Sequence, residues 1–414
     1  MNDTASARPA RADNALALAR AVLERAPLFD GHNDLPWIIR TDKIARGDVF
    51  AYALTQVHET ADTDIPRMRE GLVGAQFWAA FQPTGAPHPA LTALEQIDLI
   101  RRIEEAHPEV FLPARRAADY AKAKAAGKIA SFIAVEGGVG LENSLSPLRI
   151  WHAAGVRLMT LCHNETLDWV DSATDAPRNG GLNAFGRAVI GELNRLGIVI
   201  DLAHVSHEGM RRVLDTTEAP AAITHANAYS LCDHPRNTPD DVLKRLKENG
   251  GLVMATFVPG FVSQPLRDWL RASRDAYGKA PLAADPKAQM AEAEAKRGRA
   301  PKATLVEVAD HIERLAATAG VGHVGIGSDY FGGASPEGLE NVSCFPHLFA
   351  ELVRRGFSER DLESMSSGNM LRVMRRVEAV GRRLRKTRPR RSAESRIFRT
   401  HSGAFHQYSA PLFN

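Results

Sequence analysis

Eight short runs of apolar and β-branched residues recur along this chain, and helical patterns separate most of them. The runs cover residues 28–32, 73–81, 129–136, 157–163, 198–204, 221–225, 251–257 and 323–329, and helical patterns cover residues 91–106, 183–196, 208–216, 239–249 and 304–319. Strands that alternate with helices pair in parallel, because each helix returns the chain to the edge where the next strand begins. Eight such units in 414 residues predict an α/β protein with a (β/α)8 TIM-like barrel. A doubly wound open sheet has the same periodicity and is the structural alternative.

Three segments lie outside this alternation and set the expected domain organisation. The stretch "ALALARAVLERA" has the period of a surface helix, so residues 1–25 are expected to form an N-terminal helix before a barrel domain at 26–380. Residues 263–301 are rich in Ala, Lys and Glu, and they predict a helical insertion before the last strand, acting as a lid or a subunit contact. Residues 381–414 read as a basic, flexible tail.

The positive charge of the chain belongs to this tail. The whole sequence carries a net +3, whereas residues 381–414 hold nine Lys and Arg against Glu394, so the tail carries +8 and the rest −5. A mildly acidic body argues against nucleic acid as a partner. The tail itself is expected to be a solvated segment, with an anionic partner as the alternative.

Cysteine usage and hydropathy exclude further classes of protein. Cys162, Cys232 and Cys344 are too few and too scattered for a disulfide framework or a cysteine-based zinc site. No apolar run reaches the length of a membrane span, and the N-terminal stretch lacks the apolar core of a signal peptide. We therefore expect a cytoplasmic protein with no membrane partner.

Polar side chains follow six of the eight predicted strands. They are His32 and Asp34, Glu136, His163, His204, His225 and Asp329. A single His or Asp at a strand end is usually a cap or a satisfied core group. Seven such residues at corresponding positions are hard to attribute to caps, and in parallel barrels this rim is where active sites are built.

The residue types at this rim indicate a metal site. His32 and Asp34 are two positions apart, so in an extended strand both side chains point the same way, although Asp34 as a cap is the simpler reading of that tripeptide alone. Nitrogen and oxygen donors without thiolate suit Zn²⁺, with Mn²⁺ or Co²⁺ as alternatives. The five candidate ligands are His32, Asp34, Glu136, His204 and His225. A single catalytic zinc takes three protein ligands, so five predict two metal ions that share a carboxylate.

Other polar and aromatic residues near these motifs receive weaker expectations. Asp201 precedes His204 by three positions, which places it on the opposite face of the strand, so it is left out of the ligand set. His207 and His234 are expected to be surface or loop residues. Trp169, Tyr229 and Phe331 are candidates for either the pocket wall or the core.

With these residues in view, the sequence resembles the membrane (renal) dipeptidase family of zinc metallopeptidases, which have amidohydrolase-like barrels. The resemblance extends over residues 29–377. It rests on the motifs "DGHNDLPW", "EGG", "RLMTLCHNETLDW", "IDLAHVS", "THANAYSLCDHPRN" and "HVGIGSDYFGG", supported by "EGLENVS" and "GNMLRVM". Six separated motifs in the family's order make this a specific match.

The resemblance implies a role for each rim residue. His32 and Asp34 would hold one zinc, His204 and His225 the other, and Glu136 would bridge the two, with a hydroxide between the ions as nucleophile. His163 would contact the substrate carbonyl or oxyanion. Arg236 would bind the terminal carboxylate of the dipeptide, although bracing its own loop is the alternative. Asp329 would carry the proton to the leaving amine.

These assignments predict a binuclear zinc dipeptidase that acts on small dipeptides with a free C-terminus and tolerates an L or D residue there. Members of the family are often homodimers, and the sequence leaves the oligomeric state of this chain open. The alternatives are a related amidohydrolase acting on N-acyl amino acids, lactams or lactones, and a catalytically silent metal-binding protein. Where the family commonly shows a "TPWAD"-like run, this chain reads "LDWVD", and the added Asp168 would favour basic dipeptides if it lay near the pocket.

Overall fold

The strands close into an eight-stranded parallel barrel. The computed structural model describes residues 14–59, 61–277 and 286–389. The barrel strands are β1 (Leu28–Asn33), β2 (Val73–Phe81), β4 (Ile129–Glu136), β5 (Val156–Thr160), β6 (Val199–Asp201), β7 (Ala221–Ile223), β8 (Leu252–Ala255) and β9 (Val324–Ile326). Each strand pairs in parallel with the next, β9 pairs with β1, and β2 pairs with β4. The predicted barrel is confirmed, and the open-sheet alternative is wrong because both edges are paired.

One strand was missed by the sequence pattern. β3 (Phe111–Pro113) pairs in parallel with the first residues of β4, beside the point where β5 begins to pair with the same strand. Only Phe111 of its three residues is buried. A segment this short carries no alternation from which a strand could be read.

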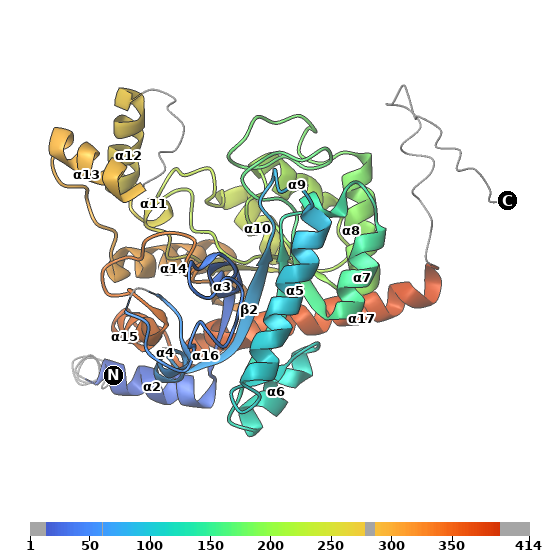
Figure 1. The fold of residues 1–414 in the computed structure, drawn as a ribbon, viewed down its shortest axis with the longest axis horizontal. Coiled ribbons are helices and arrows are strands. Elements are labelled where there is room, and N and C mark those ends of the chain that lie inside the picture. The colour runs from blue at the N-terminus through green and yellow to red at the C-terminus, as the bar shows by residue number, and fades with distance from the viewer. Residues whose placement is uncertain (1–13, 60, 278–285, 390–414) are drawn as a thin grey trace, which may run out of the picture.

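Helices surround the barrel, and the five predicted ones all end at the predicted residue (Figure 1). The helices that follow or precede the strands are α2 (Ala15–Arg25), α3 (Leu35–Thr41), α4 (Ile65–Glu70), α5 (Pro89–Ala106), α6 (Ala117–Ala125), α7 (Ser146–Ala154), α8 (Ala184–Leu196), α9 (His207–Thr216), α10 (Asp240–Asn249), α11 (Pro259–Val262), α12 (Gln264–Tyr277), α13 (Pro286–Arg297), α14 (Leu305–Ala319), α15 (Phe345–Arg354), α16 (Glu359–Glu363) and α17 (Asn369–Thr387). None of the helices in the described ranges combines the length and apolar character needed to cross a lipid bilayer.

The barrel interior is filled below its rim. Phe29 of β1, Phe77 of β2 and Phe132 of β4 lie with ring centroids 5.1 to 5.3 Å apart, and all three are fully buried. Met370 and Met374 of α17 belong to the same buried cluster. The barrel interior is therefore a packed core, and a site formed at the strand ends lies at a rim of the barrel and not inside it.

The two peripheral segments differ in how well they follow the prediction. α12 and α13 lie between β8 and α14, and Figure 1 shows them projecting from the body of the molecule. The predicted start of the flexible tail at Gly381 is wrong, because α17 continues to Thr387. Val377, Gly381 and Leu384 are buried along one face of this helix, and that spacing keeps a strongly basic sequence helical. Residues 390–414 of the predicted tail and residues 1–13 lie outside the described residues.

Candidate metal centre and substrate pocket

Seven polar side chains converge where the strands end. β1 contains His32 and is followed by Asp34, and β4 ends at Glu136. The four others lie just beyond β5, β6, β7 and β9, and they are His163, His204, His225 and Asp329. All seven belong to groups whose possible ligand atoms lie within 4.8 Å of one another. The carboxyl ends of parallel strands meet at one rim, so the strand-end pattern in the sequence becomes a cluster in space.

Glu136 lies at the centre of this cluster. Its Oε1 is 3.2 Å from His204 Nε2 and 3.8 Å from His225 Nε2, and its Oε2 is 3.6 Å from His32 Nε2. One carboxylate oxygen thus faces His204 and His225, and the other faces His32. This arrangement suits a carboxylate shared by two cations.

The remaining acidic residues extend the cluster on the His32 side. His32 Nε2 is 3.4 Å from Asp34 Oδ2 and 3.9 Å from Asp329 Oδ1. The possible ligand groups are His32 with Glu136 and His225, Glu136 with His163 and His204, and His32 with Asp34 and Asp329. His163 and Asp329 therefore lie close enough to the other donors to reach the same ions or a substrate beside them.

Unpartnered buried atoms favour occupation by cations. His32 Nε2 and His225 Nε2 are buried and have no hydrogen-bond partner, which is rare for buried polar atoms. Three carboxylates, those of Asp34, Glu136 and Asp329, share the site with one fixed cation, Arg236. Metal ions would supply both the missing partners and the missing positive charge, so the residues fit the group that the sequence predicts.

The pKa values of these groups reflect the same imbalance. Burial opposes the charged form of His32, yet Glu136 and Asp34 outweigh it and raise the His32 pKa well above its usual value. Burial raises the pKa of Asp34 and raises that of Asp329 to about 8. Burial alone would raise the pKa of Glu136, but His32 and His204 hold it well below its usual range. In the absence of metal ions, His32 and Asp329 therefore bind protons more readily than usual, and these protons offset the negative charge of the cluster.

His225 is oriented by a hydrogen-bonded chain from inside the barrel. Its Nδ1 lies 2.8 Å from Thr224 Oγ1, which donates to Asp201 Oδ2 at 2.7 Å. Asp201 also accepts from Thr160 Oγ1 at 2.6 Å. Because the Thr224 hydroxyl donates to the carboxylate, it accepts from Nδ1–H of His225, and the Nε2 lone pair is left free towards Glu136. Asp201 belongs to none of the possible ligand groups, and this supporting role was not predicted from the sequence.

A second buried carboxylate fixes β1 against β9 below the rim. Asp30 accepts from the backbone N–H of Ser328 at 2.8 Å and from its hydroxyl at 2.7 Å. Asp30 lies two positions before His32, and Ser328 immediately precedes Asp329. In both Asp30 and Asp201 the signal available in the sequence is an acidic residue two or three positions before a rim histidine inside an apolar run.

The backbone is strained at the site. His204, Asp329 and Phe331 have φ values of 68°, 61° and 73°. Non-glycine residues adopt this left-handed conformation at a cost of roughly 1 kcal/mol or more, so it persists where surrounding contacts impose it. At His204 and Asp329 the turn directs a rim side chain towards Glu136.

Beside the cluster lies a cavity of about 290 Å³ with two kinds of wall. The polar wall carries Asp34, Glu136, His163, His204, Arg236 and Asp329. The other wall carries Trp37, Phe81, Val258, Phe261 and Phe331. The structure thus places Arg236, identified from the sequence alone, in the same cavity as the rim residues.

Arg236 is buried and only partly satisfied. Its side chain is 2% exposed, its guanidinium lies 5.2 Å from the ring centroid of Phe261, and its Nε and Nη1 have no hydrogen-bond partner. A buried cation with free donors costs stability unless an anion reaches it. This guanidinium is therefore available to a carboxylate that enters the cavity.

The other residues that the sequence analysis considered for the pocket differ in whether they line the cavity. Phe331 lines the cavity, whereas Trp169 is a buried core residue packed against Phe185. Tyr229 is 38% exposed and contacts the ring of His207, the first residue of α9. Asp168 does not line the cavity, and it accepts a hydrogen bond from Asn143 on the surface. The expected influence of Asp168 on a substrate side chain therefore has no structural support.

His163 has two neighbours in the site. Its ring centroid lies 4.3 Å from that of His204 and 4.7 Å from that of Phe81. Burial lowers its pKa, which keeps the imidazole neutral with one N–H to donate.

Comparison with known proteins gives consistent matches. The family model of the membrane dipeptidases (peptidase family M19) matches residues 16–388. Dipeptidase aclJ of Aspergillus oryzae is 37% identical over 383 residues, which cover 89% of this chain and 82% of that protein. Dipeptidase 3 of Rattus norvegicus is 37% identical over 374 residues, covering 87% of this chain and 67% of that protein.

Solved structures share the fold. The probable dipeptidase PvdM from Pseudomonas aeruginosa superposes with a TM-score of 0.76 at 24% identity and covers 89% of this chain and 99% of that one. A metallo peptidase from Rhodobacter sphaeroides, solved with a phosphinate mimic of the dipeptide L-Ala-D-Ala, gives a TM-score of 0.70 at 23% identity, over 85% of this chain and 99% of that one.

Proposed function

The chain belongs to the membrane dipeptidase family (peptidase family M19) of metallopeptidases, and from that premise we propose that it hydrolyses dipeptides with a free C-terminal carboxylate at a centre of two zinc ions. The observation that carries this proposal is the buried, partly unpartnered guanidinium of Arg236 in the same cavity as the metal-ligand cluster.

The ligand assignment follows from the positions around Glu136. We assign His32 and Asp34 to one ion, His204 and His225 to the other, and Glu136 to both, in line with its two oxygens facing the two sides. Two zinc ions held there would polarise the scissile carbonyl and lower the pKa of a water towards neutrality.

The other residues bind the substrate and handle its protons. Arg236 would hold the terminal carboxylate, and its planar fork matches that group. The neutral His163 would donate a hydrogen bond to the carbonyl oxygen as negative charge develops there. Asp329 would take a proton from the attacking water and deliver it to the leaving nitrogen, for which its place beside His32 and its protonatable carboxyl are suited.

Substrate selection would depend on the ends of the dipeptide and on the apolar wall. A substrate held by its carboxylate and its scissile carbonyl is gripped through its backbone, so an L or D residue at the C-terminal position is accommodated. Trp37, Phe81, Phe261 and Phe331 offer aromatic surface and no charge to a side chain. We therefore expect apolar or small neutral side chains to be preferred over basic ones.

The test is hydrolysis by the zinc-loaded protein of matched dipeptides that carry an L or D second residue, a free or amidated C-terminus, and a free or acetylated N-terminus. We expect cleavage of the free-carboxylate dipeptides of both chiralities and little cleavage of the amides. Arg236→Gln should raise KM for free dipeptides by roughly 10- to 100-fold, the range for a charge-assisted pair, and Arg236→Lys should recover part of this loss.

Two results would overturn the proposal. Preferential cleavage of the acetylated set would identify a different amidohydrolase with the same barrel. An unchanged KM in Arg236→Gln would show that this guanidinium does not bind the substrate carboxylate.

A further inference from the structure

A second cavity, of about 260 Å³, lies at the amino ends of β5 and β6. In a parallel barrel this is the rim opposite the metal centre. Its wall includes Arg115 and Arg116 before α6, Arg157 of β5, and Arg382 and Arg385 of α17. His152 of α7 and Glu378 of α17 also line it. Segments far apart in the sequence thus bring five guanidinium groups to one cavity.

The positive charge in this cavity is not neutralised by the described part of the chain. Glu378 is the one carboxylate in the wall, and it lies 3.8 Å from Arg382 while accepting a hydrogen bond from the backbone N–H of Ala117. Asp119 lies nearby, but it accepts from the backbone N–H groups of Arg115 and Arg116 and pairs with Lys122. Five arginines against one carboxylate leave an excess of about four positive charges.

Two of the arginines are held in place by backbone carbonyls. Arg157 donates to the carbonyl oxygens of Arg115, His152 and Val156 at 2.7, 3.0 and 2.7 Å. Arg385 donates to the carbonyl oxygens of Arg195 and Leu196 at 3.1 and 2.7 Å. Neither has a carboxylate within ion-pair distance among residues 14–59, 61–277 and 286–389. Carbonyl oxygens fix the position of a guanidinium without cancelling its charge, so the cavity is preorganised.

The positive charge of these arginines shifts the pKa values of neighbouring groups. Burial and then Arg157, Arg385, Arg195 and Arg115 lower the pKa of His152 to about 4. Burial and then Arg115 lower the pKa of Arg157 to about 10. His152 is therefore neutral at physiological pH, and like charges in the cavity repel one another. An anion in the cavity would relieve that repulsion.

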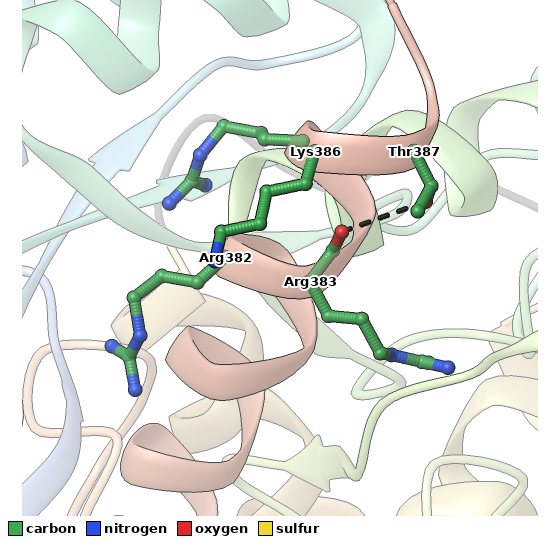
Figure 2. A pocket seen from close by; sticks show the side chains of 5 residues that line it. Arg382, Arg383, Lys386 and Thr387 are labelled. Atoms are coloured by element: carbon green, nitrogen blue, oxygen red, sulfur yellow. Dashed lines mark hydrogen bonds between the residues drawn. The ribbon is translucent and has the colours of Figure 1, made fainter.

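The basic surface continues along the end of α17. Figure 2 shows Arg382 and Arg383 leaving the last turns of α17 in different directions, near Lys386. Arg383 does not line the cavity and lies 3.5 Å from Glu218. Arg382 is therefore part of the cavity wall, whereas Arg383 belongs to a surface that already has an acidic partner.

We propose that this arginine-lined cavity binds a phosphate group, presented by a small phosphate-bearing molecule or by a phospholipid headgroup. The guanidinium fork matches phosphate oxygens in pairs, and a dianion matches the charge excess better than a carboxylate does. The cavity is separate from the proposed catalytic residues, so this binding does not depend on the proposed function.

The test is isothermal titration of the zinc-loaded protein with inorganic phosphate, in parallel with flotation on vesicles of phosphatidylcholine with and without phosphatidic acid. The double variant Arg116→Gln/Arg382→Gln removes two exposed arginines of the cavity. Among the described residues, Glu378 is the one carboxylate that pairs with either of them. The matched control Arg375→Gln/Arg383→Gln removes the same charge from exposed positions of α17 outside the cavity.

We expect the cavity variant to weaken phosphate binding by about tenfold or more while the control binds as the unmodified chain does, since two charge-assisted contacts are lost. Phosphate that binds at the zinc centre would bind equally well to both variants, and this distinguishes it from phosphate that binds in the arginine-lined cavity. Vesicle binding that requires phosphatidic acid and the cavity arginines, without binding of free phosphate, would support the headgroup as the source. Binding that is absent with both probes, or reduced equally in both variants, would overturn the proposal.

Discussion

At the scale of single residues, the orientation of a rim histidine can depend on partners that lie deeper in the barrel. His225 shows this most clearly, because Thr224 connects its Nδ1 to the carboxylate of Asp201. A ligand histidine whose second nitrogen is fixed in this way keeps one tautomer and one ring orientation. The affinity of the centre should therefore depend on residues that never touch a metal ion.

We predict that Thr224→Val weakens zinc binding by roughly 10- to 100-fold, the range for loss of such a supporting hydrogen bond, with the fold retained. Valine has nearly the same shape but cannot link His225 to Asp201. Competition with a chromogenic chelator measures the affinity, and circular dichroism checks the fold. Thr224→Ser keeps the hydroxyl and should restore binding. Equal affinity in the Val and Ser variants would contradict the supporting role.

At the scale of elements, α17 ties the lower side of the barrel to α8, and Figure 1 shows it running from beside α16 towards α8. Its close approach depends on a glycine. A Cβ at Gly381 would lie 2.7 Å from the Cα and 2.8 Å from the N of Gly197, the residue that ends α8. Both contacts are with backbone, which cannot rotate away.

We predict that Gly381→Ala destabilises the protein by about 1–3 kcal/mol through overpacking, although alanine is normally the better helix residue. Gly191 in α8 is the matched control, because a Cβ there meets nothing within 4 Å. Gly191→Ala should instead stabilise by about 0.5–1 kcal/mol. Urea denaturation of the two variants measures both changes. A stabilising Gly381→Ala would mean that α17 does not pack against α8 as described.

At the scale of the whole molecule, histidines with lowered pKa values contribute to the way stability depends on pH. Burial lowers the pKa of seven histidines, which are His152, His163, His204, His207, His225, His311 and His323. In the unfolded chain each would titrate near its ordinary pKa of about 6.5. His32 and the buried carboxyl groups of Asp30, Asp34, Asp201 and Asp329 have raised pKa values, which act in the opposite direction, so the effect of one histidine is isolated by its own variant.

We predict that neutral histidines such as His152 make the melting temperature decline as the pH drops from about 6.5 towards 4, because over this range a proton binds the histidine in the unfolded chain more readily than in the folded one. The stability contributed by neutral histidines is present above that pH and is lost towards pH 4, the value to which the His152 pKa is lowered. Scanning calorimetry across this range measures the trend. His152→Gln should make the decline shallower, and a decline that is unchanged would contradict the assignment.

The second prediction at this scale concerns metal removal. Without metal ions, the carboxyl groups of Asp34, Glu136 and Asp329 lie around Arg236 and His32, and the site binds protons where cations would bind. Chelation should therefore lower the melting temperature, and excess zinc should restore it, since a ligand at 1,000 times its Kd adds about 4 kcal/mol. Asp34→Asn should reduce the zinc-dependent rise, because it removes one charge that zinc offsets. A melting temperature that does not respond to zinc would argue against a metal centre.

The sequence by itself determined the barrel and most of the site, for a local reason. Hydrophobic periodicity and strand-end polarity are properties of neighbouring residues, and parallel barrels bring all strand ends to one rim. The residues from His32 to Asp329 could therefore be grouped without coordinates, and the structure places them within ligand distance of one another.

Tertiary structure decided what depends on contacts between distant segments. β3 is too short to show a pattern, Asp168 accepts a hydrogen bond from Asn143 and does not line the cavity, and α17 stays helical past Gly381 because its buried face packs against α8. The support of His225 by Asp201 and the convergence of five arginines on one cavity likewise join residues from separate elements. Such contacts are set by how the elements pack, and no local pattern in the chain encodes them.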